Sequence, residues 1–326
     1  MLVDSHKRLH DYLRISLTDS CNFRCQYCMP NENIQCLPNN HLMQVDEIEQ
    51  IAKIFVDLGV NKIRLTGGEP LVRKEFPEIL HRLSKLPVEI SLTTNAVLAH
   101  KFIAELNAGG VRSINVSLDT LNSETFKKIT KRDQFQKVWD NILLLLQEGF
   151  RVKINTVAIE GVIEKEILDF VAITKNLPLH VRMIEFMPFE GNHWNSKKVV
   201  TAKQMLEWVE SEYDMVKLKD EPHATAKKYK AIGHEGTFAF ITTMTEHFCG
   251  DCNRMRLTAD GKMKNCLFGS EEMDLLGTLR KGKDIIPLIK SSVIRKHAVM
   301  GGQFGKSYKR ADASQLKNRS MIKIGG

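Results

Sequence analysis

The sequence lacks the features of a membrane, secreted or repetitive protein. Its longest uninterrupted apolar run is Ile142 to Leu146, far short of the ~20 residues that a membrane-spanning helix needs. The first residues, 1–7, contain no hydrophobic core of a signal peptide. No part is of low complexity, and no repeat or linker is obvious. A cytoplasmic, globular protein with no membrane association is therefore the default expectation.

Cysteine is scarce outside two clusters. The chain has 326 residues, enough for one large domain or one and a half, and seven cysteines. Six of them form two groups of three: Cys21, Cys25 and Cys28, then Cys249, Cys252 and Cys266. In a reducing compartment, clustered cysteines are typical of metal ligands rather than of disulfides. The seventh, Cys36, is expected to be a small, semi-buried residue with no metal role.

The first group has the spacing C-x3-C-x2-C and follows the strand-like run Tyr12–Leu17. A structural zinc ion takes four ligands. A cubane iron–sulfur cluster has four irons, so three cysteines leave one iron open to another ligand. The spacing alone leaves a zinc loop or a chance cluster as alternatives.

The second group has the spacing C-x2-C-x13-C and again supplies three ligands. A zinc knuckle with His247 as fourth ligand is the alternative interpretation. Arg254 and Arg256, two residues apart, would share one face of an extended segment beside the metal. This arrangement suits a substrate whose base binds the metal and whose phosphates bind arginine.

Up to about Phe186, strand-like runs alternate with helical stretches, which indicates a parallel sheet. The strand-like runs are Tyr12–Leu17, Lys62–Thr66, Glu89–Thr93, Ser113–Ser117, Val152–Val157 and His180–Phe186. The helical stretches are Asp46–Leu58, Phe135–Glu148, Glu164–Lys175 and Thr201–Glu212. About six such units are too few for a closed eight-fold barrel. We expect an open, partial TIM-type barrel, with a doubly wound sheet as the alternative. In both folds, ligands gather at the carboxyl ends of the strands.

The alternation ends near Glu221. Gly233 to Thr243 has the pattern of a short strand pair, and the second cysteines, a short helical stretch and a Lys/Arg-rich tail follow. We therefore expect two parts: residues 1–220 as the partial barrel, and residues 221–326 as a C-terminal extension that carries the second cluster and packs on the barrel.

The loop Thr66-Gly67-Gly68-Glu69-Pro70 directly follows the second strand-like run. Two glycines allow the backbone to approach a ligand closely, and a carboxylate can bind an ammonium group. An ordinary tight turn is the alternative.

Cations interrupt four of the strand-like runs: Arg14, Arg64, Lys153 and Arg182. The chain also carries a net charge of +8. An unpaired charge inside a barrel is very costly, so these residues imply either a buried anion or strand edges that face solvent. For all four together, a polyanion such as a triphosphate is the better explanation.

These motifs, taken together, carry a resemblance. The cysteine pattern with Tyr27, followed by the Gly-Gly-Glu loop, resembles the signatures of radical S-adenosylmethionine (SAM) enzymes. The order of motifs is similar to that of the MoaA-type GTP 3′,8-cyclases of molybdenum cofactor biosynthesis, and it covers nearly the whole chain. The matching stretches are Leu13–Ser16, Cys21–Pro30, Ile63–Arg73, Thr93–Asn95, Asn115–Asp119, Lys153–Val157, Arg182–Pro188, Cys249–Leu257, Cys266 and Gly325-Gly326. Ala96 departs from the family, where a glycine is more usual.

The resemblance implies an incomplete (βα)6 barrel, SAM as cofactor and two [4Fe–4S] clusters. Cys21, Cys25 and Cys28 would hold the first cluster, and Cys249, Cys252 and Cys266 the second, whose open iron meets the guanine of GTP. The implied SAM contacts are Tyr27, Gly68, Glu69, Ser117 and Met187. The implied GTP contacts are Arg14, Arg64, Thr94, Lys153, Arg182, Arg254 and Arg256, and Thr93 could replace Thr94. The implied catalytic residues are Arg254, Arg256, Gly325 and Gly326.

The implied reaction uses a 5′-deoxyadenosyl radical to remove the 3′ hydrogen of GTP, after which the ribose carbon attacks guanine C8. The product is (8S)-3′,8-cyclo-7,8-dihydroguanosine 5′-triphosphate. The family also suggests a homodimer, an external electron donor and a possible hand-off of product to the next enzyme.

Two other functions compete with this one. A radical SAM enzyme that modifies peptides would also carry auxiliary clusters, although usually with more C-terminal cysteines. A basic zinc protein that binds nucleic acid has some support from the cationic tail of residues 306–323, but no recognised nucleic-acid motif is present.

Overall fold

The protein is described here by a computed structural model that covers residues 1–29, 35–304, 308–310 and 316–325. Within these ranges twelve strands form one sheet in the order β12-β11-β10-β1-β2-β3-β4-β5-β6-β9-β8-β7. The central strands are β1 (Tyr12–Ser16), β2 (Lys62–Thr66), β3 (Glu89–Thr94), β4 (Ser113–Ser117), β5 (Arg151–Ala158) and β6 (His180–Glu185). They pair in parallel, each with the next, which confirms the six predicted strands to within a residue or two.

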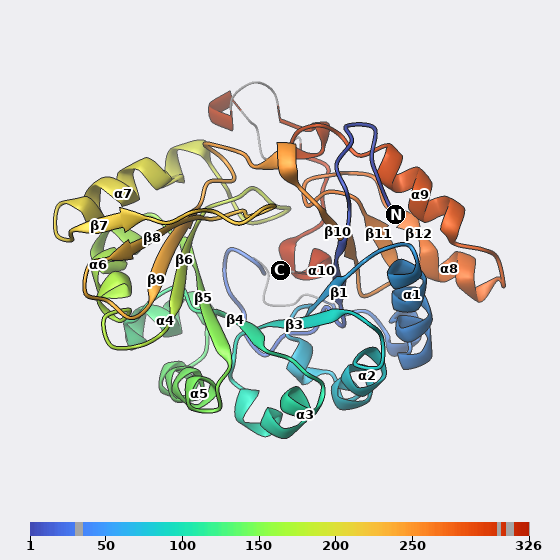
Figure 1. Cartoon of the computed structure of the whole chain (residues 1–326), viewed down its shortest axis with the longest axis horizontal. Coiled ribbons are helices and arrows are strands. Elements are labelled where there is room, and N and C mark those ends of the chain that lie inside the picture. Colours follow the sequence, from blue (N-terminus) through green and yellow to red (C-terminus); the bar gives the residue numbers. More distant parts are fainter. Residues whose placement is uncertain (30–34, 305–307, 311–315, 326) are drawn as a thin grey trace.

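Helices connect these strands and lie on the outer, convex side of the sheet (Figure 1). They are α1 (Val45–Asp57), α2 (Phe76–Leu83), α3 (Ile103–Ala108), α4 (Ser123–Thr130), α5 (Phe135–Gln147), α6 (Ile163–Ala172) and α7 (Ala202–Glu210). Because these helices cover one face, the doubly wound alternative is wrong. The sheet curves but does not close on itself within the described residues. The sequence predicted α1, α5, α6 and α7 but not the shorter α2, α3 and α4.

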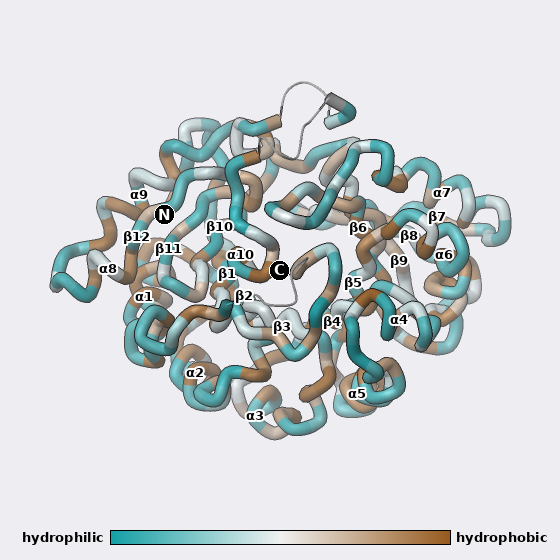
Figure 2. Tube along the Cα trace, turned by 180° about the vertical axis from the view of Figure 1, so that it is seen from behind, coloured by the Kyte–Doolittle hydropathy of each residue, from teal (hydrophilic) through white to brown (hydrophobic). Residues whose placement is uncertain are grey.

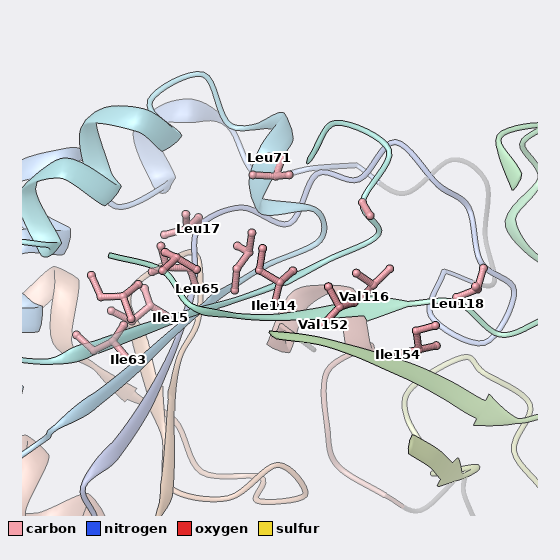
Figure 3. Packing of buried hydrophobic residues seen from close by; sticks show 14 of the residues in the cluster. Ile15, Leu17, Ile63, Leu65, Leu71, Ile114, Val116, Leu118, Val152 and Ile154 are labelled. Carbon is pink, nitrogen blue, oxygen red and sulfur yellow. The ribbon is translucent and has the colours of Figure 1, made fainter. Parts of the chain in front are cut away.

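The core lies between the sheet and the helices, and alternation along each strand explains it. Side chains of a strand point to opposite faces in turn. Figure 3 shows Ile15, Ile63, Leu65, Ile114 and Val116 gathered on the helix side of neighbouring strands, and all five are buried. The residues between them, such as Arg14 and Asn115, therefore face the concave side. This assigns the strand cations of the sequence to the interior of the arc.

The helices bury one stripe each, as the sequence spacing indicates. In α1 the buried residues are Ile48, Ile51, Ala52 and Phe55, at intervals of three and four. Its start is fixed by a capping box between Gln44 and Glu47. Along the outer helices, hydrophilic and hydrophobic segments alternate accordingly (Figure 2). No helix in the described ranges has the length and apolar character needed to cross a membrane.

The C-terminal third extends both ends of the same sheet. At one end β9 (Thr237–Ile241) pairs in parallel with β6 and continues into β8 (Lys227–Ala231) and β7 (Met215–Lys217). The strand pair predicted within Gly233–Thr243 is wrong in its bounds, because this range contains only β9, and the partner strand β8 ends at Ala231, before the range begins. The boundary predicted at residue 220 falls between β7 and β8, and the two-part division stays a prediction.

At the other end β10 (Arg254–Leu257) pairs in parallel with β1. It continues into β11 (Lys262–Lys264) and β12 (Met273–Asp274), followed by α8 (Leu275–Arg280) and α9 (Ile286–Ile294). The sequence predicted only a short helical stretch here. The last helix, α10 (Met321–Ile324), lies inside the arc of strands, where Figure 1 also places the C-terminus.

Candidate functional site

The two cysteine groups face one cavity of about 300 Å³ on the concave side of the sheet. The predicted site residues that line it are Arg14, Cys21, Cys25, Tyr27, Cys28, Gly68, Glu69, Thr94, Ser117, Arg182, Met187, Cys249, Cys252, Arg254, Arg256 and Cys266. Arg64, Lys153 and Gly325 are not among the lining residues. Gly326 lies outside the described residues. The fold thus brings together motifs that are distant in the sequence.

The glycine loop after β2 is fastened to the loop that leads into Cys21. Gly68 N donates to Thr18 O at 2.7 Å, and Glu69 N donates to Ser20 O at 2.8 Å. A Cβ on Gly67 would lie 2.6 Å from Thr18 O, and one on Gly68 would overlap Ser20 O. The glycines therefore permit a close approach between two loops of the site, in addition to any approach to a ligand.

Glu69 is a buried carboxylate at the base of this loop. It accepts hydrogen bonds from Thr94 Oγ1 at 2.7 Å, from Asn95 N at 2.6 Å and from Leu71 N at 3.0 Å. Burial nevertheless raises the pKa of Glu69 to about 7. Thr94 is thus bonded to Glu69, whereas Thr93, the alternative that the sequence left open, is half-buried and also lines the cavity.

Tyr27 is held by a carboxylate that the sequence did not single out. Its hydroxyl donates to Asp119 Oδ2 at 2.7 Å, and Asp119 Oδ1 accepts from Val157 N at 2.9 Å. Burial raises the pKa of Asp119 to about 6. Ser117 ends β4 two residues before Asp119, Val157 lies at the end of β5, and Met187 follows β6. The carboxyl ends of these three strands therefore meet at the part of the cavity that Tyr27 lines.

The first three thiols lie in surroundings that oppose their ionisation. Burial, and then the charge of Glu69, raises the pKa of Cys21 to about 11. Burial and Asp119 raise the pKa of Cys25, and burial and Cys21 raise that of Cys28. Cys21 Sγ also accepts from Phe23 N at 3.4 Å. A cationic centre bound by all three sulfurs would favour the thiolates and offset this cost, so the set fits a metal cluster.

In the second group the surroundings differ from one thiol to the next, since burial raises the pKa of Cys249 whereas nearby cations lower that of Cys252. Burial would raise the pKa of Cys252, but Arg254 and Lys296 outweigh it and hold the pKa at about 6. Cys249 Sγ accepts from Met300 N at 3.4 Å, and Cys252 Sγ accepts from Lys296 Nζ at 3.4 Å. These donors fit thiolate ligands. Over the described ranges, no group of three or more His, Cys, Asp or Glu side chains is arranged to hold a single metal ion.

Between the cysteine groups lies a set of buried arginines. Strand register places Arg14 beside Arg64 on one side and beside Arg256 on the other. Burial, followed by Arg64 and Arg14, lowers the pKa of Arg182 to about 9. Within the described ranges, Nε of Arg14 and Nε and Nη2 of Arg182 are buried without a hydrogen-bond partner. Such guanidinium groups are costly unless an anion binds them, so the cavity is prepared for a polyanion.

Arg64 and Lys153 contribute charge from just outside the cavity. Arg64 Nε donates to the Tyr12 hydroxyl and Nη1 donates to Leu92 O at 3.1 Å, so protein groups already occupy two of its five N–H donors. Burial, then Arg182 and Arg64, lowers the pKa of Lys153 to about 8. Direct contact of either residue with a nucleotide stays a prediction.

The C-terminal tail reaches the arginine set. Arg256 Nη1 donates to the carbonyl oxygen of Gly325. Gly325 has φ of +88°, and a Cβ there would lie 3.0 Å from Ser16 Cβ and 3.2 Å from Thr66 Cγ2. Its lack of a side chain therefore matters at the ends of β1 and β2, whereas the catalytic role that the resemblance implies for Gly325 stays a prediction.

Several polar residues of the cavity were not predicted. Oδ1 of Asn115 and Oδ1 of Asn155 are buried without a partner within the described ranges, and both residues line the cavity. They lie at concave-facing strand positions, like Arg14, and this alternation could have identified them. Ala96 adopts φ of +62°, which explains why a glycine suits that turn. Cys36 is exposed, so its predicted semi-burial is wrong.

Comparison with known proteins identifies the family. A model described as Radical SAM superfamily matches residues 15–173, and one described as Molybdenum Cofactor Synthesis C matches residues 179–300. These two ranges contain the first and the second cysteine group, respectively.

Full-length relatives agree with these matches. The chain is 44% identical to the mitochondrial GTP 3′,8-cyclase of Arabidopsis thaliana, over 100% of this chain and 84% of that protein. It is 40% identical to the GTP 3′,8-cyclase of Desulforamulus reducens, over 86% of this chain and 88% of that protein. It is also 45% identical to the mouse molybdenum cofactor biosynthesis protein 1 over 99% of this chain, which spans only 51% of the mouse protein.

Solved structures support the fold. SuiB of Streptococcus suis bound to its precursor peptide SuiA matches 95% of this chain and 77% of its own, with a TM-score of 0.62 and 17% identity. SuiB bound to SAM matches 94% of this chain and 72% of its own, with a TM-score of 0.59 and 16% identity. The sequence matches go further than the fold, and this chain belongs to the GTP 3′,8-cyclase family of the radical SAM superfamily.

Proposed function

We propose that the chain catalyses the conversion of GTP into (8S)-3′,8-cyclo-7,8-dihydroguanosine 5′-triphosphate, the first step of molybdenum cofactor biosynthesis. The observation that carries the proposal is the cavity in which two three-thiol groups flank Arg14 and Arg182, whose Nε atoms, with Nη2 of Arg182, are buried and have no partner among the described residues. Relatives at 40% to 44% identity are named for this activity. The chain spans about half the length of its mammalian relatives, so the activity is proposed for the chain as given.

Two [4Fe–4S] clusters would be held by the cysteine groups, the first by Cys21, Cys25 and Cys28 and the second by Cys249, Cys252 and Cys266. Together with SAM, such a site supplies a 5′-deoxyadenosyl radical, which can remove hydrogen from an unactivated C–H bond. The chain's own residues orient the two nucleosides and exclude water from the cavity.

The SAM contacts would come from the carboxyl ends of β1, β2, β4 and β6. Gly68 and Glu69 lie at the base of the glycine loop, where a backbone carbonyl or the carboxylate can hold an ammonium group. Ser117 and Met187 line the same cavity as Tyr27. The hydrogen bond to Asp119 fixes the Tyr27 ring at this position.

The triphosphate of GTP would lie against the arginines. Arg14 and Arg182 have free, buried N–H groups for phosphate oxygens, and Lys153 and Arg64 add positive charge nearby. Arg254 stacks over the Phe248 ring at 4.7 Å and lies beside Cys252, so it can contact phosphate or base near the second centre. Arg256, bonded to Gly325, would hold the tail at the reacting ribose, and a catalytic role of Gly326 stays part of the proposal.

We further interpret the open sheet as an incomplete (βα)6 barrel of residues 1–220, with residues 221–326 covering its open side. A homodimer, an external electron donor and hand-off of the product remain part of the proposal. Nucleic-acid binding is not part of the proposal, and within the basic tail Arg319 is paired with Asp260 at 2.9 Å and with Glu272 at 2.5 Å. The compartment in which the protein works stays a prediction.

The test is an anaerobic assay of the reconstituted chain with SAM, GTP and a reductant, followed by mass spectrometry. We expect 5′-deoxyadenosine and an isomer of GTP to form together, and only when GTP is present. The Arg14→Met variant should lose the isomer, whereas the exposed Arg112→Met should not. Equal SAM cleavage without GTP and no isomer would refute GTP as substrate. Stimulation by a peptide instead would favour peptide modification.

A further inference from the structure

Lys296 is a buried lysine that follows α9 and lies against the second cysteine group. Only 3% of it is exposed. Its Nζ lies 3.4 Å from Cys252 Sγ, 2.9 Å from Arg254 O and 3.5 Å from His10 Nδ1. An ammonium group has three N–H donors, and each of these acceptors can take one. The geometry is therefore complete without water.

The only anionic group among these three acceptors is the sulfur. A buried ammonium that bonds only neutral groups is costly. The arrangement is thus favourable when Cys252 is a thiolate, which is the state of a metal ligand.

The N-terminal segment holds Lys296 in place. Asp4 Oδ2 lies 3.0 Å from His10 Nε2. Because an ionised carboxylate only accepts hydrogen bonds, Nε2 carries the proton and Nδ1 presents its lone pair to Lys296. Arg8 Nε also donates to Asp4 Oδ2, at 2.6 Å. A line of contacts thus runs from Asp4 through His10 and Lys296 to the Cys252 sulfur.

The same segment also supports the loop of Cys249. Arg8 Nη1 donates to Cys249 O at 2.6 Å and to Ala298 O at 2.9 Å, and Nη2 donates to His297 O at 2.8 Å. Residues 297 to 300 lead to Met300, whose N–H donates to Cys249 Sγ. The N-terminal residues therefore fix the second centre on two sides, and they do so outside the cavity that would bind GTP.

We propose that Lys296 is a positioning residue of the second metal centre, which sets the reduction potential of the cluster by donating to the Cys252 sulfur, with Asp4 and His10 holding its ammonium group. This inference rests on the proposed function, because it requires a cluster on the second cysteine group. A positive charge and a hydrogen bond at a ligand sulfur stabilise the reduced, more negative state of a cluster, so they raise its potential.

The experiment uses the full chain with Cys21, Cys25 and Cys28 each changed to Ala, which retains only the second cysteine group. In this background, Lys296→Met, Lys296→Gln and Lys296→Arg are compared. Lys290→Met is the matched control, because Lys290 is an exposed lysine of α9. The measurements are iron and sulfide per chain and the midpoint potential from a redox titration followed by electron paramagnetic resonance.

The expected order of potentials is background, Lys290→Met and Lys296→Arg highest, then Lys296→Gln, then Lys296→Met lowest. Arg retains the charge, Gln retains only a donor, and Met retains neither. If the Lys296→Met variant does not retain its cluster, the midpoint potential of the Lys296→Gln variant tests the inference. An unchanged potential in the neutral variants, or an equal shift in Lys290→Met, overturns the inference. A background chain that assembles no cluster overturns the proposed function, and this inference with it.

Discussion

The substitution Arg182→Met should stabilise the chain free of ligand and metal while it weakens GTP binding. Arg182 is a buried cation with two N–H groups that lack partners within the described ranges. Burial, with Arg64 and Arg14, lowers its pKa from 12.5 to about 9. Each tenfold change in proton affinity is about 1.4 kcal/mol, so the charge costs the folded state roughly 5 kcal/mol. Methionine keeps much of the aliphatic stem and removes the charge.

Allowing for lost contacts of the longer side chain, we expect the free energy of unfolding to rise by about 2 to 4 kcal/mol. The dissociation constant for GTP should rise roughly 10- to 100-fold, the value of one or two charge-assisted hydrogen bonds. The assay is urea unfolding of the metal-free chain, with and without GTP. GTP should raise the unfolding midpoint of the parent, by mass action, and at the same GTP concentration it should raise that of the variant by less.

The Arg73→Met variant is the comparison for Arg182→Met, because it removes a buried arginine whose N–H groups are hydrogen-bonded. Arg73 is also a buried arginine, but its Nη1 donates to Leu17 O and its Nη2 to Met43 O, both at 2.6 Å. Its loss leaves two carbonyl groups unpaired, so we expect destabilisation by about 2 to 4 kcal/mol. The exposed Arg112→Met should change stability by less than about 0.5 kcal/mol. If Arg182→Met is destabilised as much as Arg73→Met, the reasoning from unpaired buried charge is refuted.

Three further predictions concern the same cavity. The pKa of Lys153 is about 8, and a bound anion favours the charged form of this lysine. The affinity for GTP, measured by calorimetry, should therefore fall about tenfold from pH 7 to pH 9. The Lys153→Met variant should show no such pH dependence. The Gly325→Ala variant places a Cβ 3.0 Å from Ser16 Cβ at a positive φ. It should lower product formation about 5- to 30-fold without changing the unfolding midpoint. Unaltered turnover would contradict the role of the tail. The Gly68→Ala variant should separate the glycine loop from Ser20. The reconstituted variant should therefore retain about half of the iron bound by the parent chain. A full iron content would contradict the role of the contact between Gly68 and Ser20.

The sequence predicted the strands of the sheet, and it located cations on those strands, because both follow from local patterns. Arg14 and Lys153 each lie between two apolar residues of a strand, and in this sheet such positions face the side opposite the helices. The same pattern did not reveal that Arg64 is bonded to Tyr12, because that contact depends on the register between β1 and β2. The short α3 spans too few turns to show a helical period.

The sequence also did not predict contacts between segments that are far apart in the chain. Nothing local in Arg254–Leu257 indicates that this segment joins the sheet beside β1, although the two alternating arginines correctly indicated an extended segment. Likewise, the bond between Lys296 and Cys252 connects segments whose proximity depends on the position of α9. Residues that act through tertiary contacts of this kind carry no motif of their own.

The pairing of β1 with β10 also sets an order of assembly during protein synthesis. Strand β1 emerges from the ribosome early, but its second neighbour begins only at Arg254. At ~5–20 residues per second, that delay is roughly 10 to 50 s. Throughout it, β1 presents an open strand edge that can pair with another nascent chain. The first cysteine loop thus exists well before Arg256 arrives beside Arg14, so a chain released before residue 257 should aggregate rather than form half of the site.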